Sequence, residues 1–61
     1  MNPSEARSHR LQELTKMVYK LDNEGVDKDD IIIAITKRAH QMAAPSTAKN
    51  YVDEIKRRFS K

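Results

Sequence analysis

Apolar positions recur every three or four residues in three separate stretches of the chain, a spacing that places them on one face of an α-helix. The first stripe consists of Leu11, Leu14, Met17, Val18 and Leu21. Ahead of it, Asn2 can act as an N-cap and Pro3 suits the first helical position, while Gly25 supplies the left-handed residue that commonly ends a helix. The pattern predicts a first helix over about residues 3–24.

A second helix is expected over about residues 28–42. Asp27 stands at its N-cap position, and Asp29 and Asp30 complement the positive end of the helix dipole. The run IIIAI is β-branched and has the composition of a buried strand. Helical spacing continues from this run through Ile35, Ala39 and Met42. The acidic start and this spacing favour a helix over a strand.

Pro45 separates the second stretch from the third, because it disfavours helical geometry at Ala44 and itself fits the first position of a new helix. The third stripe consists of Ala48, Tyr51, Val52, Ile55 and Phe59. Tyr51 and Phe59 share the face of the aliphatic residues, so both are expected to be core anchors rather than base-stacking side chains. This helix should cover about residues 45–60.

Three amphipathic helices with short connections can close around one core. One glycine and two prolines in 61 residues argue against the many turns that a sheet of short strands requires. We therefore expect an all-α fold, a single domain over residues 1–61 that forms a three-helix bundle with a helix-turn-helix.

Charge is unevenly distributed along this chain of net charge +3. Up to Asp30 there are five Lys and Arg against seven acids, a net of −2, and from Ile31 onward seven against two, a net of +5. The second half is therefore where a polyanion would be attracted. Cysteine is absent, which fits a reducing, cytoplasmic setting, and no apolar run approaches the roughly 20 residues that span a membrane.

Catalytic and metal chemistry find little support in the sequence. His9 and His40, the two histidines, fall on different helices and lack acidic partners at ligand spacing. The acidic run DKDD lacks the alternation and glycine of a calcium loop, and there is no glycine-rich phosphate loop. We expect a protein that is not an enzyme and has no cofactor, metal or small-molecule substrate.

The polar side of the third helix, opposite its apolar stripe, suggests a binding role. A helix, a tight turn and a second helix form the geometry that lets one helix enter the major groove of duplex DNA. The sequence STAKNYVDEIKRR resembles the recognition helix of tri-helical and winged-helix DNA-binding domains. The matching positions are Thr47, Ala48, Lys49, Tyr51, Val52 and Ile55. The chain departs from these families in having Met42 to Pro45 at the turn and no expected wing after Lys61.

This resemblance implies roles for individual residues. The outward positions at the start of the helix, expected at base edges, are Ser46, Lys49, Asn50 and Asp53. Thr47, at the helix N-terminus, suits a phosphate. The residues expected to follow the DNA backbone are Lys56, Arg57 and Lys61, and those expected to brace neighbouring phosphates from the second helix are Lys37, Arg38 and Gln41.

We therefore expect sequence-specific or semi-specific binding of double-stranded DNA by a small transcriptional regulator or architectural factor. The alternative is a protein-interaction module whose basic face binds an acidic partner. A solvated face is the simplest alternative, since Asp53 and Glu54 can pair with basic residues of the same helix. RNA binding is disfavoured because no exposed aromatic residues are expected for base stacking.

The first helix is longer than a core of this size requires. At about 22 residues it spans some 33 Å, and the surplus favours a homodimer through this helix, because helix-turn-helix proteins often pair to read two half-sites. Its basic residues form a candidate second basic edge, consisting of Arg7, Arg10, Lys16 and Lys20.

Overall fold

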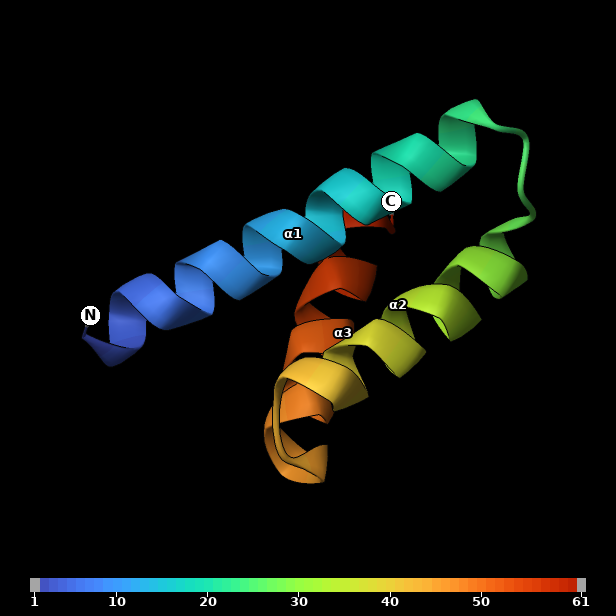
Figure 1. Cartoon of the computed structure of the whole chain (residues 1–61). Helices are drawn as coiled ribbons and strands as arrows, with labels where there is room; N and C mark the ends of the chain where they lie inside the picture. Colours follow the sequence, from blue (N-terminus) through green and yellow to red (C-terminus); the bar gives the residue numbers. More distant parts are fainter. Residues whose placement is uncertain (1, 61) are drawn as a thin grey trace.

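The computed structural model describes residues 2–60, which form three α-helices and no strand. Helix α1 spans Pro3–Asn23, α2 spans Lys28–Met42 and α3 spans Pro45–Phe59 (Figure 1). The expected all-α three-helix fold is confirmed, and each helix begins and ends within one residue of its expected bounds.

The helix ends show which of the expected caps form. The Asn2 carboxamide oxygen accepts a hydrogen bond from the Glu5 amide at 2.9 Å, as its N-cap position predicts. Asp27 occupies the N-cap position of α2, but its side chain makes no capping hydrogen bond. Its carboxylate therefore acts on the helix through its charge alone. At the start of α3 the N-cap is Ala44, which has no side chain able to cap.

Gly25 ends α1 in the left-handed conformation, with φ of +82°. Its amide bonds the Asp22 carbonyl at 3.0 Å, and the Val26 amide bonds the Leu21 carbonyl at 3.1 Å. This pair of bonds is the Schellman motif, which satisfies the last carbonyls of a helix and turns the chain. The turn directs the chain back along α1 into α2.

Replacing Gly25 by Ala is expected to destabilise the protein by about 1 to 2 kcal/mol, because an L-residue with a Cβ is strained at positive φ. A Cβ added there meets no atom within 4 Å, so backbone strain is the sole cause of the effect. Urea unfolding followed by circular dichroism measures the loss. Gly25→Asn is the matched control, since Asn tolerates this conformation and should lose less; equal losses in both variants would contradict the explanation.

The core lies where the three helices meet. Within residues 2–60, the ten buried residues that form it are Leu11, Leu14, Val18, Ile31, Ile35, Ala39, Ala48, Tyr51, Val52 and Ile55. All belong to the stripes or the apolar run that the sequence indicates. The stripe residues at the margins of the core, which are only partly buried, are Met17, Leu21, Met42 and Phe59. Phe59 is thus a marginal rather than a central anchor, and it packs edge-to-face against Tyr19 with ring centroids 5.1 Å apart.

Helix α1 extends well past the core at its N-terminal end (Figure 1). Its 21 residues correspond to about 32 Å at 1.5 Å per residue, and its buried residues begin only at Leu11. The first two turns, from Pro3 to Arg10, therefore project beyond the bundle. We call this segment the α1 overhang.

Candidate nucleic-acid interface

The outward face of α3 is set by the residues that α3 buries. Ala48 and Ile55 are 0% and 1% exposed and fix the rotation of the helix against α1 and α2. The predicted contact residues that are consequently exposed are Ser46, Lys49, Asn50, Lys56 and Arg57, and those that are partly buried are Thr47 and Asp53. The expected rotation of this helix is therefore correct.

Two carboxylates on α3 hold basic side chains in place. Lys49 Nζ lies 3.1 Å from Asp53 Oδ2, one helical turn away. Glu54 pairs with Arg57 at 3.3 Å and with Arg58 at 3.6 Å. Exposed pairs of this kind contribute at most about 1 kcal/mol each, so a stronger anionic partner can displace the carboxylates at little cost.

Helix α3 and the α1 overhang line an open cleft of about 500 Å³. From α3 its lining residues are Thr47, Asn50, Tyr51, Asp53 and Arg57, and from α1 they are Pro3, Ala6, Arg7 and Arg10. Figure 1 shows that the two helices diverge from the place where the end of α3 meets α1, so the cleft lies in the angle between them. Four predicted contact residues are thereby brought together around one space.

Arg7 and Arg10 are charged residues of this cleft, and the sequence did not indicate that they lie beside α3. Arg10 Nη1 donates a hydrogen bond to the Tyr51 hydroxyl at 3.3 Å, and Arg7 lies 3.7 Å from Glu54. The sequence grouped both arginines with Lys16 and Lys20 as one basic edge. The structure separates them, since neither lysine lines the cleft.

The three residues of α2 that were predicted to contact DNA phosphates do not line the cleft. Arg38 forms a two-point ion pair with Glu13 of α1, with Nε 3.3 Å from Oε2 and Nη2 3.1 Å from Oε1. Its Nη1 also donates to Gln41 Oε1 at 3.2 Å. Arg38 thus joins Gln41 and also contacts α1, and none of Arg38, Gln41 and the exposed Lys37 lines the cleft. Bracing of DNA phosphates by these three residues stays a prediction.

Lys56 lies at a second hollow, of about 450 Å³, near the C-terminal end of α3. Its apolar walls include Tyr19, Ile32 and Phe59, and Lys28 lies beside them. Lys56 thus lies on a different side of α3 from its neighbours Asp53 and Arg57, which line the cleft. Lys61, which was expected to follow the DNA backbone with it, lies outside the described residues.

The connection between α2 and α3 consists of Ala43 and Ala44. Both adopt extended backbone geometry, with φ of −153° and −61°. The turn therefore needs no glycine, which accounts for the departure of this segment from the helix-turn-helix pattern that it resembles. Two residues suffice because Pro45 starts α3 immediately.

Within residues 2–60, no group of three or more metal-ligating side chains lies close together, and His9 and His40 are exposed. None of the three helices is both long enough and apolar enough to cross a membrane. In comparisons with protein-family models, curated proteins and solved structures, nothing was found to match this chain.

Proposed function

We propose that the protein binds double-stranded DNA with α3 in the major groove, as a small transcriptional regulator or architectural factor. The observation that carries the proposal is the exposed polar face of α3, which follows α2 after a two-residue link and is rigidly held by the core on its other side. A helix fixed in this way can enter a groove without reordering its backbone.

The residues of this face form two groups, one suited to base edges and one suited to phosphates. Lys49 and Asn50 have the donors and acceptors that match guanine and adenine edges, and both are exposed near the start of α3. Asp53 can accept a hydrogen bond from the amino group of cytosine. Lys56 and Arg57 lie further along the helix, where they would bind phosphates and fix the register of the helix on the duplex.

A protein-interaction module remains the second candidate. The pairing of Lys49 with Asp53 and of Arg57 with Glu54 favours it, because internal ion pairs lower the positive potential of the face. An acidic protein partner can bind a surface whose positive potential is weaker than DNA binding requires. Its carboxylates would replace those of Asp53 and Glu54 in the ion pairs with Lys49 and Arg57.

The unmodified protein is expected to bind a labelled mixed-sequence duplex with a strong dependence on salt. If three to five phosphates are contacted, the logarithm of the binding constant should fall with the logarithm of salt concentration with a slope of about −3 to −5. Fluorescence anisotropy at several salt concentrations gives this slope. Absence of binding at low salt, with helicity intact by circular dichroism, would contradict DNA binding and favour the protein-interaction module.

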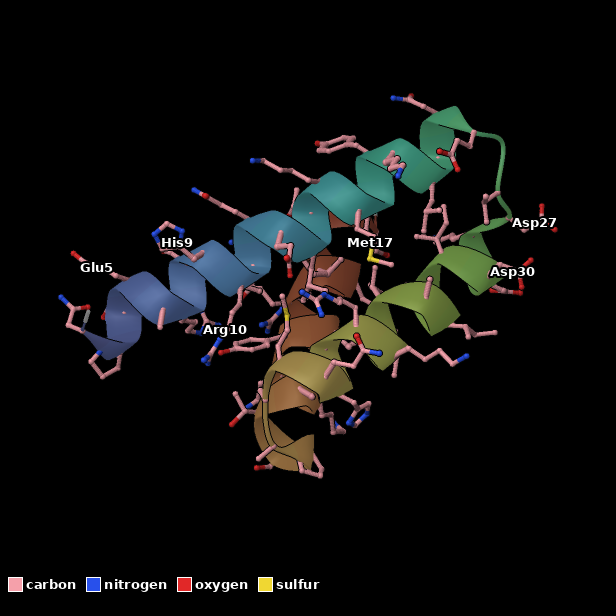
Figure 2. The ribbon with its side chains drawn as sticks, viewed as in Figure 1. Glu5, His9, Arg10, Met17, Asp27 and Asp30 are labelled. Atoms are coloured by element: carbon pink, nitrogen blue, oxygen red, sulfur yellow. The ribbon has the colours of Figure 1, made fainter. Side chains whose placement is uncertain are left out.

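The homodimer through α1 stays a prediction. The α1 overhang supplies the surplus length on which it depends, but the outer side of this segment is polar, with Glu5 and His9 pointing away from α3 (Figure 2). Association through this side would therefore bury little apolar surface. A polar contact of this kind is more compatible with a dimer that is held together mainly by a shared DNA duplex.

A further inference from the structure

The side of the α1 overhang that faces α3 is basic. Arg10 and Arg7 lie four and seven residues before Leu14, so they continue the buried stripe of α1 beyond the point where the core ends. Figure 2 shows Arg10 on the α3 side of the helix, with Glu5 and His9 on the opposite side. Apolar residues are thus replaced by arginines where α1 no longer has a core to cover.

These arginines converge with Arg57 of α3 around one cleft. Arg10 is anchored by its hydrogen bond to the Tyr51 hydroxyl, whose ring is buried in the core. Arg7 and Arg57 approach the same carboxylate oxygen of Glu54, at 3.7 and 3.3 Å. Two guanidinium groups from different helices are therefore already gathered about one negatively charged group.

The charge around the cleft remains positive after its internal pairs are counted. Asp53 and Glu54 are the acids at the cleft and in its ion pairs, and the bases are Arg7, Arg10, Lys49, Arg57 and Arg58. Five bases against two acids leave a net charge of +3. The surplus favours an anion in the cleft, and the planar fork of arginine suits a phosphate in particular.

Hydrogen-bond donors for such an anion are also present at the start of α3. Ala44 offers no capping side chain, so the Thr47 amide receives no cap from it. Thr47 itself lines the cleft. Free amides at a helix N-terminus attract phosphate oxygens, and here that of Thr47 is present in addition to the three arginines.

We propose that the cleft between the α1 overhang and α3 binds the sugar-phosphate backbone of one DNA strand while α3 lies in the adjacent major groove. The inference rests on the proposed function and extends it, since it assigns phosphate contacts to Arg7 and Arg10 of α1. Their guanidinium groups bind phosphate oxygens together with Arg57, and Glu54 positions Arg7 and Arg57 until the strand arrives. Helix α1 thus helps to hold the duplex against α3.

The test compares Arg7→Ala/Arg10→Ala with Lys16→Ala/Lys20→Ala, which removes the same charge from exposed positions of α1 outside the cleft. The arginine variant is expected to reduce the magnitude of the salt slope by about 2 and the affinity at 0.1 M salt by roughly 10²-fold, because two phosphate contacts are lost. The lysine variant should keep the slope of the unmodified protein. Equal slopes in the two variants would overturn the assignment.

A second measurement does not depend on how well a variant folds. In the unmodified protein, duplex DNA is expected to slow the modification of Arg7 and Arg10 by phenylglyoxal, as followed by mass spectrometry. Modification at the same rate with and without the duplex would overturn the proposal. Inorganic phosphate at matched ionic strength should displace the duplex no better than chloride does, and stronger displacement would assign the cleft to a small phosphate ligand instead.

These experiments distinguish a failure of the cleft assignment from a failure of DNA binding as a whole. If the unmodified protein binds the duplex and substitutions on α3 weaken it, while the arginine and lysine variants behave alike, DNA binding stands and the cleft assignment fails. If the unmodified protein does not bind DNA at low salt, both fail together.

Discussion

Simultaneous replacement of Lys49, Lys56 and Arg57 by Ala is expected to weaken duplex binding by about 10²- to 10³-fold at 0.1 M salt. Each phosphate neutralised by a protein charge contributes about 0.9 to the slope of log binding constant against log salt, so three charges correspond to about 2.7 logarithmic units at that concentration. Anisotropy titrations of this variant and of the unmodified protein measure the difference directly. The slope itself should become shallower by the same amount.

The substitutions should leave the fold intact, because all three side chains are exposed and their ion pairs with Asp53 and Glu54 are weak. Lys16→Ala/Lys20→Ala is the control, since it removes two positive charges from exposed positions of α1 that lie outside the cleft and outside the hollow at Lys56. A small loss per charge removed in the control locates the binding energy on α3. Equal losses per charge removed in the two variants would show that net charge alone governs binding, and α3 would not be the reading helix.

The helices and most of the core could be predicted because both depend on local spacing. The run IIIAI shows that spacing predicts the element even where composition favours another one. Its composition is that of a strand, yet helical spacing separates Ile31 and Ile35, which are buried, from Ile33, which is 58% exposed. The helix ends followed from single residues with special backbone preferences: Gly25 adopts positive φ, and Pro45 has a fixed φ that suits the first position of a helix. Such signals act within a few residues and need no knowledge of the tertiary structure.

The cleft could not be predicted, because it depends on the angle at which two distant helices cross. The contact between Arg10 and Tyr51 joins residues 41 positions apart, and the ion pair of Arg38 with Glu13 joins residues 25 positions apart. A sequence pattern gives the buried face of each helix but not the crossing angle, which is set by how side chains interdigitate. The pairs within α3 were foreseeable for the opposite reason, since Lys49 and Asp53 are four residues apart on one helix.

The assignment of α3's outward face depends on its register, and Ile55→Ala tests that register most severely. Ile55 is 1% exposed and belongs with Leu14 and Ile35 to the most deeply buried side chains of the core. Truncation to Ala removes three carbons from a site enclosed by three helices, so it should cost about 2 to 5 kcal/mol in transfer and cavity energy. A domain below about 70 residues rarely has more than 3 to 5 kcal/mol of stability in total.

We therefore expect the Ile55→Ala protein to be largely unfolded at 37 °C, and urea or thermal denaturation followed by circular dichroism at 222 nm will show this. Ile33→Ala provides the control with identical chemistry, because Ile33 is 58% exposed on α2. Its effect should lie within about 0.5 kcal/mol of zero, since little apolar surface is lost there. If the two variants unfolded alike, Ile55 would not be a core residue. The face that carries Lys49, Asn50 and Arg57 would then not be the outward face of α3, and the basis for DNA recognition by this helix would be lost.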